Sequence, residues 1–191
     1  MWAQRPDSSV VTFKAIPTMP VLWVEMPDSL MPLLAQRERM DARDYVQSSM
    51  RAELTNTLGG KSVLETLTDE WIQVKLTPSS TWEARLLPLA DGNRIICVIH
   101  TIAAKQPHSA ITCYTTAWQS LSAEHYLPAA LCMQDDHMWN RLQFSADSLT
   151  LIHHSTYLQP TAPGEASYAT TTQRYTWQNE RFVPMEGNLM P

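Results

Sequence analysis

Short segments in which apolar and polar residues alternate follow one another along most of this chain. Over residues 71–76, Ile72, Val74 and Leu76 fall on one side and Trp71 falls on the other. This alternation is typical of a half-buried strand, because successive side chains of a strand point to opposite faces of its sheet. Trp71 is therefore expected on the face opposite the aliphatic one.

Turn signals such as Pro78-Ser79-Ser80 and Asp91-Gly92 separate the strands that this pattern predicts. Beyond residue 80, strands are expected over 82–87, 94–103, 110–119, 139–144, 149–158, 170–177 and 181–185, and a short helix or loop over 122–131. Each strand with its turn takes roughly 10–12 residues, which is typical of an antiparallel meander, a sandwich or an open barrel.

The N-terminal third predicts helices instead of strands. Prolines interrupt residues 15–40, so we expect only a short helix there, capped by Asp28 or Ser29 and running through Leu34. A second short helix is expected from Asp41 to about Ser49.

Residues 51–67 fit two interpretations. A spacing of four among the apolar residues would continue the second helix to a cap at Gly59. Alternation of Ala52, Leu54 and Leu58, together with the Gly59-Gly60 pair, instead favours a hairpin, and this is the interpretation that we prefer.

These patterns together predict a mainly β (α+β) fold: an antiparallel β meander, sandwich or open barrel with one or two short N-terminal helices. A chain of 191 residues, of which 44% are hydrophobic, can bury a sizeable core. We expect residues 1–16 to form a flexible lead-in and residues 17–191 to form a single globular domain.

Charge and hydropathy exclude several classes of partner. The net charge is −5, and the basic residues are scattered, so no basic stripe for nucleic acid is present. No stretch reaches the roughly 18 consecutive apolar residues that a transmembrane segment needs. Neither nucleic acid nor a membrane span is therefore expected.

No motif indicates a metal or cofactor, and we expect none. The chain lacks a CxxC pair, a glycine-rich phosphate loop and the GxSxG motif of serine hydrolases. His153 and His154 would point to opposite faces of one strand, and Asp135-Asp136-His137 has no second histidine at ligand spacing.

The chain has three cysteines, of which Cys97 and Cys113 lie in apolar strands and Cys132 lies beyond them. If a hairpin closes near Lys105 to His108, Cys97 and Cys113 face the same side with a diagonal offset. A disulfide between them is geometrically demanding and stays open.

Five tryptophans on predicted strands are the candidates for ligand binding: Trp71, Trp82, Trp118, Trp139 and Trp177. Aromatic rings aligned on a sheet face can bind sugars or peptides. They can equally pack in the core or across strands, which is the more common case. Trp71 is the strongest of the five candidates.

A charged cluster between the two predicted helices contains Arg39, Asp41, Arg43 and Asp44. We expect a structural role, in which Asp41 caps the second helix and Arg39 binds a carboxylate or loop carbonyls. The competing hypothesis is an anion site built from the arginines.

Four carboxylates, Glu65, Asp69, Glu70 and Glu83, could supply a general acid and base if the fold brought two of them together. A solvated rim explains them equally well. We assign no catalytic residue.

Several segments together resemble an uncharacterised family of secreted proteins in Bacteroidales-type bacteria. The resemblance rests on Met26-Pro27-Asp28 through Leu33 with Arg39 and Asp41, on Asn56 to Gly59 running into Leu67-Thr68, and on Leu86-Leu87-Pro88, His100-Thr101 and Ala117-Trp118. It covers much of residues 17–120 and implies export to the cell envelope.

The resemblance supplies no reaction, because the family is a domain of unknown function. Ala3-Gln4 would also suit a signal-peptidase boundary, although an ordinary cytosolic N-terminus fits the same residues. The location we expect is extracytoplasmic, in the periplasm or cell envelope, after signal-peptide removal. The function we expect is a non-enzymatic binding or interaction module for a glycan or a protein; the alternative is an envelope hydrolase acting on polysaccharide or peptide.

Overall fold

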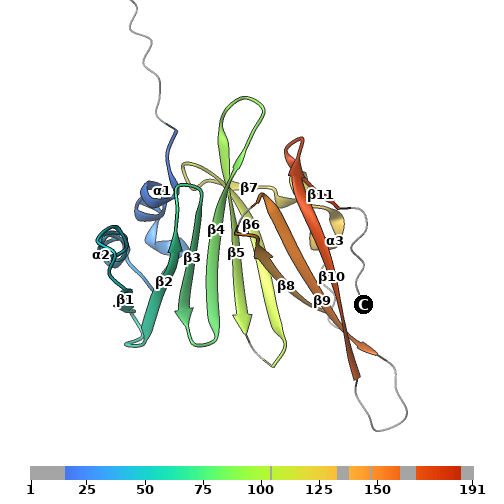
Figure 1. The fold of residues 1–191 in the computed structure, drawn as a ribbon, viewed down its shortest axis with the longest axis horizontal. Helices are drawn as coiled ribbons and strands as arrows, with labels where there is room; N and C mark the ends of the chain where they lie inside the picture. Colours follow the sequence, from blue (N-terminus) through green and yellow to red (C-terminus); the bar gives the residue numbers. More distant parts are fainter. Residues whose placement is uncertain (1–15, 104, 133–137, 147, 160–166, 186–191) are drawn as a thin grey trace, which may run out of the picture.

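The computed structural model describes residues 16–103, 105–132, 138–146, 148–159 and 167–185. The predicted lead-in over residues 1–16 therefore lies almost entirely outside the described residues, as do Asp135, Asp136 and His137. Within the described part, most residues belong to two antiparallel sheets, with short helices beside them (Figure 1). The predicted mainly β fold is confirmed, and neither sheet closes into a barrel.

The larger sheet has seven strands, paired in sequence order as a meander. They are β1 (Ala52–Thr55), β2 (Lys61–Leu67), β3 (Trp71–Thr77), β4 (Ser80–Pro88), β5 (Arg94–Ala103), β6 (Pro107–Thr115) and β7 (Ser120–Leu121). The smaller sheet has four strands, also paired in sequence order: β8 (Met138–Phe144), β9 (Thr150–Gln159), β10 (Ser167–Gln178) and β11 (Arg181–Pro184).

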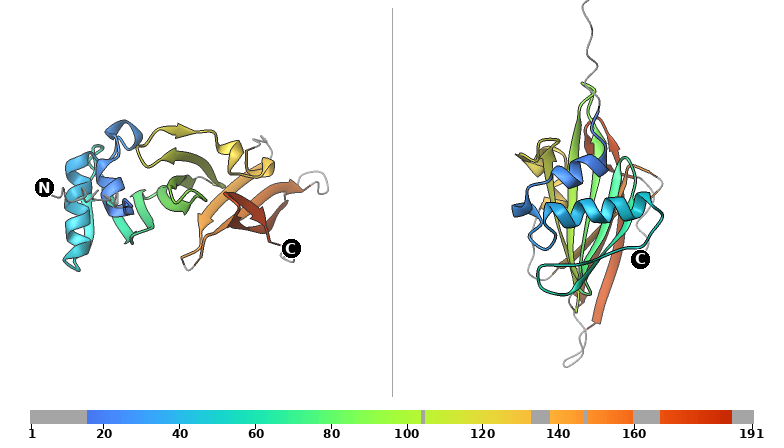
Figure 2. Two further views of the ribbon diagram at one scale, coloured as in Figure 1. Left: turned by 90° about the horizontal axis from the view of Figure 1, so that it is seen from above. Right: turned by 90° about the vertical axis from the view of Figure 1, so that its left-hand side faces the viewer.

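The helices are α1 (Met19–Glu25), the 3₁₀ turn η1 (Asp28–Leu30), α2 (Gln36–Gln47), the 3₁₀ turn η2 (Ala123–His125) and α3 (Ala129–Cys132). The N-terminal helices and the smaller sheet lie on opposite sides of the larger sheet (Figure 2). None of the helices in the described part of the chain is long and apolar enough to cross a membrane.

Strands β4 and β5 form the centre of the larger sheet and are buried on both faces. Alternate residues on one face, such as Ala84, Leu86 and Ile96, pack against α1 and α2. The residues between them, such as Leu87 and Cys97, pack against the smaller sheet. Because both faces are covered, β5 has a nearly continuous apolar sequence instead of an alternating one, whereas Glu83 and Arg85 interrupt the apolar residues of β4.

The hairpin interpretation of residues 51–67 is confirmed. Strands β1 and β2 pair from Ala52↔Leu64 to Thr55↔Lys61. A loop of residues 56–60 joins them, and Gly59 adopts a positive φ of 76° in it. Asn56 organises this loop: its Oδ1 accepts hydrogen bonds from the backbone N–H groups of Leu58 and Gly60.

The helix boundaries differ from the prediction. Helix α1 was not expected, because four prolines interrupt this region; Pro20, however, lies in the first turn of α1, where its missing N–H costs nothing. Only a 3₁₀ turn forms at Asp28, and α2 begins at Gln36, five residues before Asp41.

The register of β5 and β6 corrects the predicted offset between the cysteines. Cys97 pairs directly with Cys113, because the hairpin closes between Ala103 and Pro107. Both thiols are free and buried, and their sulfur atoms lie 3.9 Å apart.

Candidate functional site

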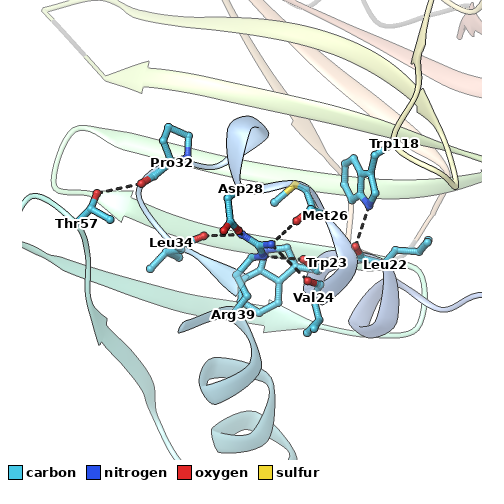
Figure 3. Close-up of polar contacts among 10 residues, drawn as sticks. All are labelled: Leu22, Trp23, Val24, Met26, Asp28, Pro32, Leu34, Arg39, Thr57 and Trp118. Atoms are coloured by element: carbon cyan, nitrogen blue, oxygen red, sulfur yellow. Dashed lines mark hydrogen bonds and ion pairs between the residues drawn. The ribbon is translucent and has the colours of Figure 1, made fainter. Parts of the chain in front are cut away.

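Arg39 is the central polar residue of the helical layer. Its side chain is fully buried, and its Nε donates to the carbonyl oxygen of Trp23 at 2.9 Å. Nη1 donates to Leu34 O at 2.6 Å and to Asp28 Oδ1 at 2.9 Å. Nη2 donates to the carbonyl oxygens of Val24 and Met26 (Figure 3). Burial lowers the pKa of this guanidinium, and Asp28 acts in the opposite direction.

These contacts cap the C-terminal end of α1. The last carbonyl groups of a helix have no partner within it and need one from elsewhere. Arg39 supplies partners for three carbonyls in and just after the last turn, and the indole N–H of Trp118 donates to Leu22 O at 2.9 Å (Figure 3). The guanidinium is thereby occupied by the protein's own backbone and by Asp28, which leaves it no part in an anion site.

The other members of the charged cluster do not join Arg39. Asp41 lies inside α2, whose N-cap is Ala35, so it does not cap the helix as we expected. Arg43 and Asp44 bind each other on the surface at 2.8 Å. The arginines therefore do not converge.

Four of the five tryptophan candidates do not form an open aromatic platform. Trp82 and Trp118 are buried against the helices. Trp177 is buried on the inner face of the smaller sheet, where its indole N–H donates to Pro88 O. Trp71 is half-buried beside Arg85, whose guanidinium carbon lies 5.9 Å from the ring centroid. These four rings serve packing.

Trp139 is the exception and lies on the outward face of the smaller sheet, half-buried in an edge-to-face contact with Tyr168. Threonine hydroxyls extend this face, since Thr156 and Thr170 are hydrogen-bonded across β9 and β10. This face carries one of the five candidate tryptophans instead of all five.

The smaller sheet rests on the larger one through the free edge of β8. Every second residue of an edge strand points its N–H away from its neighbour. In β8, Leu142 N donates to Ser109 Oγ at 2.9 Å, and Phe144 N donates to Glu83 Oε1 at 3.3 Å. Arg85 Nη1 donates to the carbonyl oxygen of Ser145, at the end of the strand. Side chains of the larger sheet thus satisfy the edge that would otherwise be unpaired.

Glu83 is the carboxylate most perturbed by this arrangement. It is 6% exposed, and its second oxygen accepts the indole N–H of Trp71 at 3.4 Å. Burial raises the pKa of Glu83 to about 7, although the hydrogen bonds from Phe144 and Trp71 and the charges of Arg85 and Arg141 lower it.

The remaining carboxylates do not approach Glu83 as catalytic partners. Glu65 and Asp69 are exposed, and Glu70 is half-exposed in an ion pair with Arg94 at 3.1 Å. Within the described part of the chain, no two of the four share a hydrogen-bonding partner. The arrangement explains Glu83 as a docking residue of the β8 edge.

His153 and Ser155 form the only histidine–serine pair on the inner face of the smaller sheet among the described residues. Ser155 Oγ lies 2.9 Å from His153 Nε2, and the same nitrogen lies 2.8 Å from Asn140 Oδ1. Burial lowers the pKa of His153 to about 4. Such a weak base, already engaged with an amide, does not activate a serine at neutral pH.

A hollow of about 320 Å³ lies between β6, the η2–α3 segment and β8. Its walls are both polar and apolar, and its lining comprises His108, Ser109, Ala110, Ile111, Ser122, Ala123, Glu124, Leu127, Leu131, Cys132, Asn140 and Leu142. A second hollow of about 350 Å³ shares Glu124, Leu127 and Cys132 with it and reaches Arg181. We call the two hollows together the β6 groove.

One wall of the β6 groove is an incomplete strand edge. Strand β7 pairs with β6 only at Cys113 and Tyr114. The N–H of Thr115 points toward β7 and binds Gln119 O. Because every second N–H of an antiparallel strand points to the same side, the N–H groups of Ile111 and Ser109, four and six residues earlier, point to this edge too. Within the described chain these two N–H groups have no hydrogen-bond partner.

The β6 groove lacks an activated nucleophile. Cys132 is exposed in it, but burial raises the pKa of its thiol, with smaller effects in the same direction from Glu124 and Cys113. A catalytic cysteine needs the opposite shift. Among the described residues, no group of three histidine, cysteine, aspartate or glutamate side chains could hold a metal ion.

The sequence gives little indication that the residues of the β6 groove form a site. They come from three segments whose proximity depends on how the sheets pack, and none belongs to a motif. The docking residues were more visible, since Glu83 and Arg85 interrupt an otherwise apolar strand. Such an interruption indicates a buried polar partner without identifying it.

Comparisons with known proteins identify a family whose function is unknown. The family model described as Protein of unknown function (DUF3256) matches residues 14–159. A domain of an uncharacterized protein from Porphyromonas gingivalis W83 is similar in structure, with a TM-score of 0.69 and 19% identity, covering 91% of this chain and 100% of that one. At this identity the likeness shows the fold alone. No curated protein matches. The resemblance to an uncharacterised family is thus confirmed.

Replacing Glu83 with glutamine should flatten the dependence of stability on pH. The pKa of Glu83 is about 7 in the folded chain and 4.5 ordinarily, so protonation of Glu83 stabilises the fold. This contribution is fully present below about pH 4.5 and is lost as the pH rises through 7. The free energy of unfolding of the native chain should therefore fall by about 2–3 kcal/mol more between pH 5 and pH 8 than that of the Glu83→Gln variant. Urea titrations at both pH values measure this. Glu65→Gln, on the surface, should behave as the native chain; an identical fall in Glu83→Gln would contradict the assignment.

Replacing Arg39 with methionine should destabilise the protein by about 3–5 kcal/mol, since buried carbonyl oxygens lose their only side-chain donor. Arg43→Met is the matched control, with an expected cost of at most about 1 kcal/mol because its ion pair is exposed. Chemical denaturation of both variants gives the comparison. Equal losses would show that Arg39 does not hold the helical layer.

Proposed function

We propose that this chain, which belongs to the family described as Protein of unknown function (DUF3256), is a non-enzymatic binding module that holds an extended peptide segment of a partner protein in the β6 groove. The observation that carries the proposal is the incomplete edge of β6 along one wall of a hollow that both apolar and polar residues line. An extended peptide can add to such an edge through its backbone and place alternate side chains in the hollow.

The groove has the chemistry that a peptide requires. The N–H groups of Ser109 and Ile111 offer backbone donors along one line. Leu127, Leu131 and Leu142 supply apolar contacts for a side chain. Glu124 and Arg181 place charges of opposite sign along the same path. A pocket of this kind binds by shape and a few polar groups.

The hydrolase alternative receives less support. His108 and Glu124 line the same hollow, but no hydrogen bond joins them in the described chain. Glu83 is committed to the β8 edge, and Cys132 has a raised pKa rather than a lowered one. A reaction would need a nucleophile or a paired acid and base, and these residues supply neither.

We propose further that the module works outside the cytoplasm, in the periplasm or cell envelope. Support comes from the sequence resemblance to secreted proteins. Partners would then be proteins of the same compartment.

A peptide selected from a phage-displayed random library against the whole chain provides the probe for this proposal. Bound to the isotope-labelled chain, the peptide should protect the amides of Ser109 and Ile111 from hydrogen exchange. Leu131→Glu should weaken the affinity at least about tenfold, equivalent to about 1.4 kcal/mol, because it places a charge against the peptide's apolar side chain.

Leu158→Glu is the matched control, since Leu158 is an exposed residue near the end of β9 and does not line the groove. Its affinity should equal that of the native chain. Protection of amides elsewhere, unchanged affinity in Leu131→Glu, or glycan binding at Trp139 with no peptide bound in the groove would contradict the proposal.

A further inference from the structure

Cys97 and Cys113 form an isolated sulfur pair at the centre of the molecule. They are directly opposite each other in β5 and β6, and both side chains face the smaller sheet. Their exposed fractions are 0% and 1%. The pair is therefore part of the core between the sheets, far from water.

The directions of the backbone N–H groups show whether Cys97 and Cys113 form a hydrogen-bonded or a non-hydrogen-bonded pair. Ala103 N–H binds Ser79 O and so points away from β6, and Cys97, six residues earlier, points its N–H the same way. Thr115 N–H binds Gln119 O and points away from β5, as does that of Cys113. Cys97 and Cys113 thus form a non-hydrogen-bonded pair, the closer of the two antiparallel types, with Cα atoms about 4.5 Å apart.

That spacing suits a disulfide. Bonded cysteines have Cα atoms about 4.4–6.8 Å apart and a sulfur–sulfur bond of about 2.05 Å. The two sulfur atoms already lie 3.9 Å apart without a bond. Rotation about the Cα–Cβ bonds can close the remaining gap, with the strands already in register.

We propose that Cys97 and Cys113 are a site of thiol oxidation, at which a disulfide-bearing oxidant converts them to a cross-strand disulfide. One thiol loses its proton, and the thiolate attacks one sulfur of the oxidant. A mixed disulfide forms with that sulfur, the S–S bond of the oxidant breaks, and its other sulfur leaves as a thiolate. The second cysteine loses its proton, attacks the protein-bound sulfur and expels the other half of the oxidant. Two electrons pass from the cysteines to the oxidant, which becomes two thiols.

The pair reacts while the chain folds or opens locally, not in the closed structure. Contact with Cys113 and burial both raise the pKa of the Cys97 thiol, so the reactive thiolate is scarce in the folded core. Cys113 is separated from the edge of the sheet only by the two-residue strand β7. Opening of that edge is the shortest path for an oxidant.

Cys132 stands apart from the pair, since it is exposed on α3. Its removal in a Cys132→Ser variant isolates the two buried thiols without disturbing the core. This variant should refold as the native chain does, which circular dichroism can verify.

The test has two arms. In the first, the reduced Cys132→Ser chain is refolded in a buffer of reduced and oxidised glutathione. In the second, the folded, reduced chain is incubated in the same buffer. Free thiols are then trapped with a maleimide in denaturant and counted by mass spectrometry. The expected product carries no maleimide, weighs two hydrogen atoms less than the reduced chain, and yields a peptide linking Cys97 to Cys113. Its melting temperature should fall when a reductant is added.

Controls distinguish this linkage from other products. Cys97→Ala and Cys113→Ala, each in the Cys132→Ser background, should keep one reactive thiol. Two maleimide adducts in both arms at every glutathione ratio would overturn the proposal. Glutathione adducts without a linked peptide, or a linkage of Cys113 to Cys132 in the native chain, would overturn it as well.

Discussion

The architecture depends on how the edge of one sheet is satisfied by the face of another. A strand edge carries unpaired N–H and C=O groups, and burying it without partners costs free energy. Here the edge of β8 lies on the larger sheet, where Ser109 and Glu83 accept its N–H groups and Arg85 donates to the carbonyl of Ser145, the residue that follows it. This contact allows the second face of β4 and β5 to be buried, and it also forms one wall of the β6 groove.

The helical layer is also held in place by side chains that bind otherwise unpaired backbone groups. Helix α1 has only seven residues and is too short to be stable alone. Its last carbonyls are bound by Arg39 of α2 and by Trp118, which follows β6. Side chains from distant segments therefore replace the glycine cap that ends many helices. In both layers, a few buried donors and acceptors determine where an element sits, while apolar contacts supply most of the stabilisation.

Local pattern predicted most of the strands and little of the site. The strand over 94–103 was located to the residue, because its apolar run lies between clear turns. Alternation also placed Trp71 on the correct face. Helix α1 was missed because Pro20 reads as a breaker unless the helix start is known. The tryptophans were ambiguous for a physical reason: a ring on a strand is equally suited to the core or the surface, and the covering layer decides which.

The groove could not be predicted at all from the sequence. Its three walls come from β6, η2–α3 and β8, and their meeting depends on the packing of two sheets. The structural role of Arg39 could be predicted from the sequence, because the five N–H donors of an arginine between short helices need acceptors. Which carbonyls it binds depends on the path of α1, which the pattern did not reveal.

Strand order also determines how the chain can reach this structure. Every strand pair in both sheets joins consecutive strands, so each sheet can form by adding hairpins along the chain. The contacts that join the layers span much longer separations: 60 residues from Arg85 to Ser145, 89 from Trp177 to Pro88 and 96 from Trp118 to Leu22. Closing such long loops is the slow part of folding. We expect the hairpins to form early and the docking of the layers to form late, an order that φ-values at Leu87 and at Leu54 can check.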